Sequence, residues 1–244
     1  MNDAVKSFEK YFLQEKIYPE MFDRMEVRVD QAEKIFDTKF FIPLSGHDSE
    51  GRKIVIIKMG RINMDQFTMH DFIKGAILGC VYLQEEEETQ IGGIAVISDC
   101  HGLQSKHIMN LTDIRDFSSF VKNNSVARVK GHFFVNLPTF AVIAADLFKM
   151  LVSEKLKMRF FVCKDYEELR KHIEPSMLPS EYGGQKSESE MFEEFKDFVN
   201  KKRHLVEQTF AFKADWSKVP MEKFKRDEND NDEQIESFRN LEID

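Results

Sequence analysis

Four basic residues stand next to a strongly apolar part of the chain. Arg128 and Lys130 open the segment RVKGHFFVNLPTF, and Lys155 and Arg159 stand four apart in SEKLKMRFF. On an extended strand, Arg128 and Lys130 point to one face and Val129 to the other. If a sheet brings the two segments together, the four cations can hold a phosphorylated group through charge-assisted hydrogen bonds. Taken singly, each of them is as readily explained as a solvated surface residue.

The residue types that catalysis needs are present but poorly placed for it. The seven histidines, at 47, 70, 101, 107, 132, 172 and 204, include no HExxH or comparable ligand spacing. Cys100 and His101 are adjacent, but neighbours on a strand point to opposite faces. GxGxxG and P-loop glycine patterns are both absent from the sequence. No pair of residues meets the geometric needs of acid–base catalysis, so we expect a binding protein, not an enzyme, with no metal and no cofactor.

An unusually apolar helix is predicted between the two basic segments. TFAVIAADLFKMLV, residues 139–152, has Asp146 and Lys149 as its only charged residues. A helix that is apolar all round is buried or faces lipid. This one is too short to span a bilayer, which takes about 20 residues. A core helix and a mobile cover over an apolar cavity therefore remain as alternatives.

A second predicted helix carries small residues one turn apart. Gly75, Ala76, Gly79 and Cys80 lie in DFIKGAILGCVYL. Small side chains in this pattern leave room for a closely packed neighbouring helix or for a ligand. The sequence alone leaves both explanations open.

These segments belong to an alternating series that begins at Lys53. Strand-like and helix-like runs follow one another: KIVIIKMG, QFTMHDFIKGAILGCVYLQE, GGIAVISD, LTDIRDFSSFVK, ARVKGHFFVN, TFAVIAADLFKMLV, KMRFFVCK and YEELRKHI. Such alternation predicts an α/β fold with a mostly parallel central sheet flanked by helices. Residues 3–17 predict an amphipathic helix before the series, and SEMFEEFKDFVNKK predicts one after it.

Composition narrows the functional class further. The chain has 244 residues and a formal net charge of −8, much of it in the acidic stretch 226–244. The rest is nearly neutral, which argues against general nucleic-acid binding. Three widely spaced cysteines indicate neither a disulfide framework nor a zinc site, and the N-terminus does not read as a signal peptide. We therefore expect a cytoplasmic protein whose membrane contact is peripheral and transient.

Several stretches together resemble the CRAL-TRIO lipid-binding family. They are EEETQIGGIAVISDCHGL, RVKGHFFVNLPTF, SEKLKMRFF and LPSEYGG, in that order. Within the family they are most similar to the branch of alpha-tocopherol transfer protein and cellular retinaldehyde-binding protein. The resemblance implies the CRAL-TRIO fold, with a hydrophobic pocket and a mobile lid helix at 138–152. It divides the chain into an N-terminal helical segment at 1–36, a remnant of the family's N-terminal domain, the lipid-binding domain at 37–205 and an extension with an acidic tail at 206–244.

The resemblance also implies the residues of two sites. Phosphoinositide-binding cations fall on Arg128, Lys130, Lys155 and Arg159. Ligand-contacting positions of the pocket fall on Ile73, Ala76, Ile77, Cys80, Ile94, Ser98, Phe117, Phe120, Val121, Val129, Phe140, Ala144, Leu147, Phe148 and Leu151. The orientation of His132 stays open, because strand parity from Val129 turns it away from the pocket whereas a bend at Gly131 turns it in.

This chain departs from the branch at several pocket positions. Ala76 and Cys80 replace small hydroxyl residues, Ser98 replaces an aromatic residue, and Leu103 replaces a tryptophan. The implied function is a carrier that takes up a tocopherol-, retinoid- or other isoprenoid-like molecule and releases it at phosphoinositide-containing membranes. The alternative is a lipid-regulated scaffold or phospholipid-binding regulatory module, in which the bound lipid only stabilises the fold.

Overall fold

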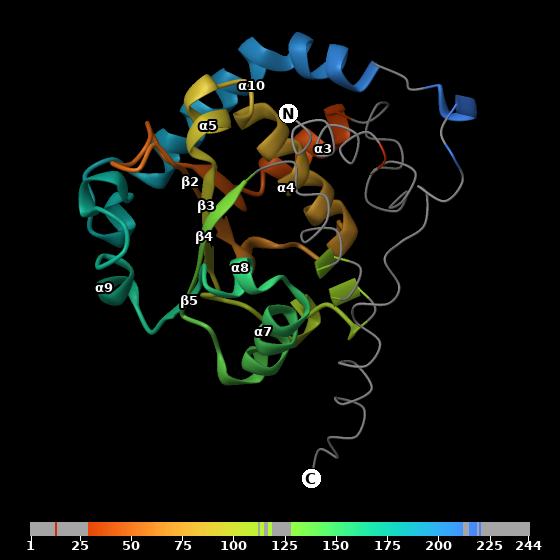
Figure 1. Cartoon of the computed structure of the whole chain (residues 1–244). Coiled ribbons are helices and arrows are strands. Elements are labelled where there is room, and N and C mark those ends of the chain that lie inside the picture. Colours follow the sequence, from red (N-terminus) through yellow and green to blue (C-terminus); the bar gives the residue numbers. More distant parts are fainter. Residues whose placement is uncertain are drawn as a thin grey trace.

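The computed structural model describes residue 13, residues 29–111, 113–114, 117–118, 128–211, 215–218 and residue 220 (Figure 1). The helix predicted at 3–17 lies outside these residues except for Leu13, and the acidic stretch 226–244 lies outside them entirely. The helix predicted at 111–122 is described only in part.

The centre of the fold is a five-stranded sheet in the order β1-β2-β3-β4-β5. The strands are β1 (Phe41–Pro43), β2 (Lys53–Lys58), β3 (Ile94–Asp99), β4 (Val129–Val135) and β5 (Phe160–Cys163). β2 to β5 are parallel and β1 is antiparallel to β2. The predicted α/β fold with a mostly parallel central sheet is thus confirmed. β1 was not predicted, since three residues are too few to show a period.

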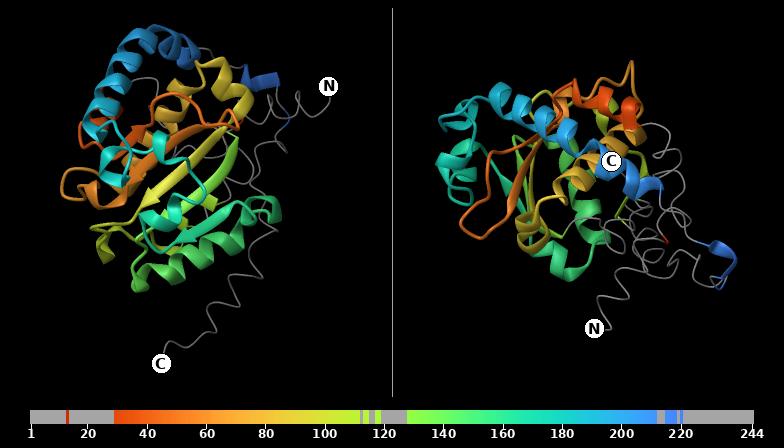
Figure 2. Two further views of the ribbon diagram at one scale, coloured as in Figure 1. Left: turned by 90° about the vertical axis from the view of Figure 1, so that its left-hand side faces the viewer. Right: turned by 90° about the horizontal axis from the view of Figure 1, so that it is seen from above.

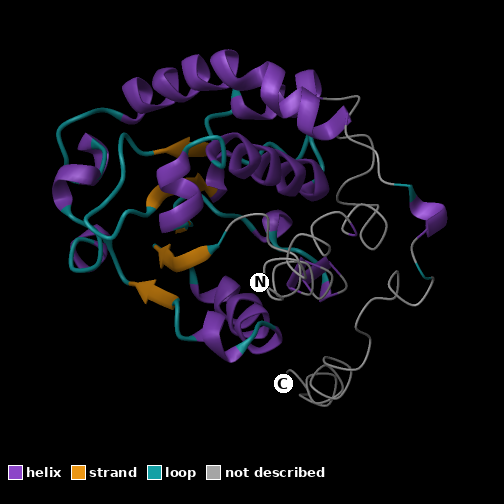
Figure 3. Cartoon of the chain, turned by 45° about the horizontal axis from the view of Figure 1, so that its top comes forward, coloured by secondary structure: helices purple, strands orange, loops and turns teal. Residues whose placement is uncertain are grey.

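Helices cover both faces of the sheet. They are α3 (Val29–Phe36), α4 (Met69–Leu83), α5 (Glu87–Gly92), α7 (Thr139–Leu151), α8 (Glu154–Lys157), α9 (Tyr166–Leu169) and α10 (Glu188–Ala211). Short 3-10 turns lie at Met59–Arg61, Ser105–His107, Pro175–Met177, Ser180–Tyr182 and Trp216–Lys218. Figure 1 shows α4 on one side of the sheet and α9 on the other. In Figures 2 and 3, α10 and α7 lie towards opposite ends of the strand order.

The two faces of the sheet bury separate apolar cores. On one face, Val55 and Ile94 pack with side chains from α3, α4 and α10. On the other face, Ile54, Ile97 and Phe133 pack with side chains from the segment 163–191, which follows β5. Alternation of side chains along each strand accounts for this division.

A buried polar cluster ties the segment after β5 to the sheet. Asp99, at the carboxyl end of β3, accepts hydrogen bonds from the hydroxyls of Tyr182 at 2.5 Å and Tyr166 at 3.0 Å, and from the His101 backbone N–H at 3.0 Å. Lys58 pairs with the same carboxylate at 3.1 Å. Burial alone would raise the pKa of Asp99, but the hydrogen bonds and the Lys58 charge lower it below its ordinary value. The carboxylate is therefore ionised at neutral pH, and its hydrogen bonds to the two tyrosines hold the segment after β5 against the sheet.

The N-terminus of α4 is fixed by a capping box. The Asp71 backbone N–H donates to the Thr68 hydroxyl at 3.2 Å, and the Thr68 backbone N–H donates to the Asp71 carboxylate at 2.8 Å. We expect Thr68→Ala to lower the free energy of unfolding by about 1 kcal/mol. The substitution removes the hydroxyl that accepts the hydrogen bond from the Asp71 backbone N–H and so breaks the capping box. Urea denaturation measures the change. Thr68→Ser, which keeps the hydroxyl, should stay within a few tenths of a kcal/mol; an equal loss in both variants would contradict the role of the cap.

Candidate functional site

A cavity of about 290 Å³ lies on the α4 face of the sheet, between α4 and α7. Its floor comes from alternate residues of the strands, among them Ile57, Val96 and Phe134. Its walls come from α4, from α7 and from the segment between β3 and β4. The surface is overwhelmingly apolar, and in the part of the chain that the structure describes it contains no Lys, Arg, Asp or Glu.

Most of the described residues that were predicted to contact a ligand line this cavity. The ten are Ile73, Ala76, Ile77, Cys80, Ile94, Ser98, Phe117, Val129, Ala144 and Phe148. Phe120 and Val121 lie outside the described residues.

Three predicted positions on α7 do not line the cavity. Phe140 is 49% exposed and points outward. Leu147 and Leu151 are buried, but they pack with Ile114 and Val152 beside the cavity. The sequence of α7 could not separate these positions because apolar residues occupy nearly its whole circumference, which leaves the inward face undefined.

The cavity has further lining residues that sequence reasoning missed. Val96 lies between Ile94 and Ser98 with strand parity, so alternation along β3 could have identified it. Others depend on how distant segments fold over the sheet: Phe40, Ile57, Met59, Ile62, Met69, Phe72, Cys100, His107, Ile108, Met109, Ile114, Phe134, Leu137, Ala141, Ala145, Leu156 and Phe160. The cavity is also lined by Leu103, which the resemblance gave as a pocket position, and by His132, whose orientation the sequence left open.

An irregularity in β4 turns His132 towards the cavity. The register between β3 and β4 pairs Ile94 with Val129 but Ala95 with Gly131, so Lys130 is an extra residue. Such a bulge shifts side-chain alternation by one position. Val129 and His132 therefore share the cavity face, although they are three residues apart. Gly131 lies towards the opposite face, where there is no room for a side chain, because a Cβ at that position would lie 2.9 Å from the Phe133 ring.

His132 and Ser98 form a polar pair in this apolar lining. The Ser98 hydroxyl and His132 Nε2 are 2.8 Å apart. The imidazole stacks on Phe134, with ring centroids 4.4 Å apart, and contacts Phe160 at 4.9 Å. Burial lowers the pKa of His132 to about 4, so the ring is neutral at pH 7.

The small residues of α4 serve two faces of the helix. A Cβ at Gly79 would lie 2.5 Å from the Phe41 ring, and one at Gly75 would lie 3.3 Å from Phe40 and Ile35, so these glycines permit close packing. Ala76 and Cys80 instead line the cavity. The glycines thus serve close packing, whereas Ala76 and Cys80 leave space within the cavity.

α7 covers the cavity with one side and presents apolar residues outward with the other. Ala141, Ala144 and Phe148 line the cavity, whereas Ile143 is 61% exposed. Its buried residues Leu147, Phe148 and Leu151 belong to the smallest of the three apolar clusters of the described structure. Displacing a helix that is held by a small apolar cluster requires less free energy than displacing an element of the main core.

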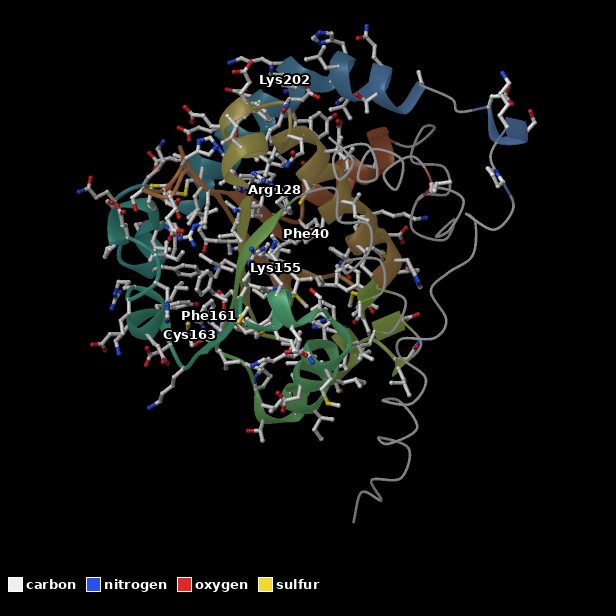
Figure 4. All side chains as sticks on the ribbon, viewed as in Figure 1. Phe40, Arg128, Lys155, Phe161, Cys163 and Lys202 are labelled. Atoms are coloured by element: carbon white, nitrogen blue, oxygen red, sulfur yellow. The ribbon has the colours of Figure 1, made fainter. Side chains whose placement is uncertain are left out.

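Three of the four predicted cations gather around the start of β4. Arg128 donates to the carbonyls of Gln90 and Ile91, which end α5. Arg159 donates to the Val129 carbonyl, and Lys130 is the bulged residue beside it. Lys155 lies on α8, and Arg159 follows the end of that helix. Figure 4 labels Arg128 and Lys155, and it shows Phe161 and Cys163 of β5 on the α9 side of the sheet.

These cations are not neutralised within the described structure. None of the four forms an ion pair with a described carboxylate. The two arginines have backbone partners, and the two lysines have no polar partner among the described residues. The group is therefore available to an anion from outside.

No group of three His, Cys, Asp or Glu residues in the described part of the chain is arranged to hold a metal ion. None of the helices in that part has both the length and the apolar character needed to cross a membrane.

The sequence and the fold are similar to those of known proteins. The family model of the CRAL/TRIO domain matches residues 37–184. Clavesin-1 of Xenopus laevis is 25% identical over 185 residues, which are 75% of this chain and 56% of that protein. Clavesin-2 of Homo sapiens is 24% identical over 185 residues, covering 75% of this chain and 57% of that protein. The crystal structure of Sfh5 shares 18% identity, covers 79% of this chain and 71% of that chain, and has a TM-score of 0.49. The chain thus spans little more than half the length of the clavesins.

Proposed function

The chain belongs to the CRAL/TRIO domain family, and from this premise we propose that it is a non-enzymatic carrier of one hydrophobic small molecule. The cavity between α4 and α7 is the observation that carries the proposal. Buried apolar surface contributes about 25 cal/mol per Å² to binding. A cavity lined almost wholly by apolar side chains therefore favours an apolar ligand.

The size of the cavity supports a small, compact ligand. Its volume of about 290 Å³ is at the lower end of the range for small-molecule sites, roughly 300–1,000 Å³. This favours an isoprenoid-like molecule, of the kind that tocopherol and retinoids represent, over a phospholipid with two acyl chains. Ala76, Cys80 and Ser98 differ from the tocopherol branch, so the ligand we propose belongs to this class without being tocopherol itself.

We place the release of the ligand at a phosphoinositide-bearing membrane. Arg128, Lys130, Lys155 and Arg159 have no acidic partner among the described residues, and a headgroup with several phosphates would satisfy them. They lie around the starts of β4 and β5, next to α8, which directly follows α7 in the chain, so we expect a headgroup bound there to favour displacement of α7. The proposed location is the cytoplasm, with transient peripheral membrane association.

Exposed apolar side chains support a membrane-facing surface. Of the six large apolar residues that are exposed in the described structure, Phe140, Val142 and Ile143 lie on α7. Ile91, whose carbonyl binds Arg128, and Met158, which precedes Arg159, lie next to the cations. Apolar residues beside basic ones are typical of surfaces that bind anionic lipid.

We expect the double substitution Phe140→Ser and Ile143→Ser to weaken vesicle binding about tenfold, because partial burial of two apolar side chains in the membrane is lost. Co-sedimentation with vesicles of phosphatidylcholine and a phosphatidylinositol bisphosphate measures the effect. The matched control Phe140→Leu with Ile143→Leu keeps the apolar character and should bind like the parent protein. If the serine variant also binds like the parent, α7 does not contact the membrane.

The carrier function itself is tested by identifying what the protein holds. Native mass spectrometry of gently purified protein is expected to show one neutral apolar ligand per chain, which leaves when acceptor vesicles are added. An empty protein, or a phospholipid that does not exchange, would contradict the carrier. The latter result would support the regulatory module, in which a bound lipid only stabilises the fold.

A further inference from the structure

The Ser98–His132 pair has unused hydrogen-bonding capacity within the apolar cavity. The two side chains contain two polar hydrogens, one on the serine hydroxyl and one on the neutral imidazole. Their mutual hydrogen bond of 2.8 Å uses one of them. Among the described residues, no other side chain or backbone group bonds to the Ser98 hydroxyl or to His132 Nδ1.

Either tautomer of His132 leaves one donor and one acceptor unused. If Nε2 carries the hydrogen, the Ser98 hydroxyl remains a free donor and Nδ1 a free acceptor. If Nδ1 carries it, Nδ1 is the free donor and the serine oxygen the free acceptor. The pair can therefore receive a hydroxyl group, which donates and accepts, or a carbonyl group, which only accepts.

His107 and Cys80, two other polar residues of the cavity, do not offer such a combination of an unused donor and an unused acceptor. His107 accepts from the Gln104 backbone N–H at 3.1 Å and is also hydrogen-bonded to the Ile62 backbone. Cys80 has a pKa raised to about 12 by burial and is a weak hydrogen-bonding group. The bulge at Lys130 fixes the position of the pair, because it turns His132, the register partner of Val96, to the face of the sheet on which Ser98 lies.

We propose that the ligand is a neutral apolar molecule with one hydroxyl or carbonyl group, and that this group hydrogen-bonds to the Ser98–His132 pair. The proposal rests on the carrier function put forward above and names the class of its ligand. It also excludes fatty-acid-type anions. No cation lines the described part of the cavity, and an unpaired carboxylate is costly to bury.

A matched series of probes tests the proposal. Farnesene, farnesol, farnesal and farnesoate share one hydrocarbon chain and differ at its end. Their affinities are measured by calorimetry at pH 7 for the parent protein and for the double variant Ser98→Ala with His132→Phe, whose phenyl ring keeps the stack on Phe134 and Phe160. We expect the variant to bind farnesol and farnesal about tenfold more weakly while its affinity for farnesene is kept or improved. The parent should bind farnesoate at least tenfold more weakly than farnesol.

A spectroscopic readout on the parent protein reports on the Ser98–His132 pair itself. The imidazole resonances of His132, assigned from their absence in His132→Phe, should shift on addition of farnesol and stay nearly unchanged with farnesene. If farnesene binds but the pair does not distinguish it from farnesol by either measurement, the polar site is overturned while the carrier stands. If the parent binds none of the four probes, the cavity function fails together with the inference.

Discussion

Ala76→Trp is expected to weaken the binding of farnesol by nearly 100-fold. Ala76 lies on α4 and faces the cavity, so an indole at this position occupies space that the ligand needs. Losing roughly 100 Å² of apolar contact, at about 25 cal/mol per Å², corresponds to about 2.5 kcal/mol. Calorimetric titration with farnesol measures the loss.

A matched control separates blocking from general damage. Ala211→Trp adds the same side chain at an exposed position near the end of α10, away from the cavity, and should leave farnesol affinity unchanged. Thermal unfolding should show that Ala76→Trp remains folded, since the new ring fills a void instead of displacing core atoms. Undiminished affinity in a folded Ala76→Trp protein would show that ligands bind elsewhere.

Reversing the two lysines of the basic group is expected to reduce binding to phosphoinositide vesicles by at least 30-fold. Lys130→Glu and Lys155→Glu each remove an attraction of about 1 kcal/mol to an anionic membrane surface and add repulsion. The lysines are preferred to the arginines because Arg128 and Arg159 also hold backbone carbonyls, so their loss would disturb the fold. Co-sedimentation with vesicles that contain a phosphatidylinositol bisphosphate provides the measurement.

The control for this prediction keeps the same change in net charge. Lys171→Glu with Lys201→Glu reverses two exposed lysines outside the basic group and should lower vesicle binding much less. Binding of the parent protein should also weaken as salt is raised, because screening reduces the attraction between exposed charges. Equal losses in the two double variants would mean that net charge alone governs binding. Farnesol affinity in solution should be the same in both, since neither pair lines the cavity.

The regular elements could be predicted well from the sequence. The predicted strand KIVIIKMG contains β2, and the predicted helix over 139–152 is within one residue of α7. Runs of apolar residues bounded by turn residues determine such elements locally, so a single segment carries enough information.

What could not be predicted depends on contacts between segments. The orientation of His132 was left open because parity fails at a bulge, and the bulge at Lys130 exists only in the pairing of β3 with β4. The resemblance placed Phe140 in the pocket, and the helix around it is apolar on nearly every side, so nothing in the sequence indicated that this side chain is exposed. The Ser98–His132 hydrogen bond joins two strands 34 residues apart in sequence, so no local pattern could reveal it.

The sequential strand order has a consequence for how such a protein can diversify. Successive parallel strands that lie side by side, joined by right-handed crossovers, put every crossover on the same face of the sheet. Here the described parts of the crossovers form the walls of the cavity, while the opposite layer is made by the chain that comes after the last strand. Sequence changes in the crossovers can therefore alter the shape of the cavity, while the layer on the opposite face, which hydrogen-bonds to Asp99, stays unchanged.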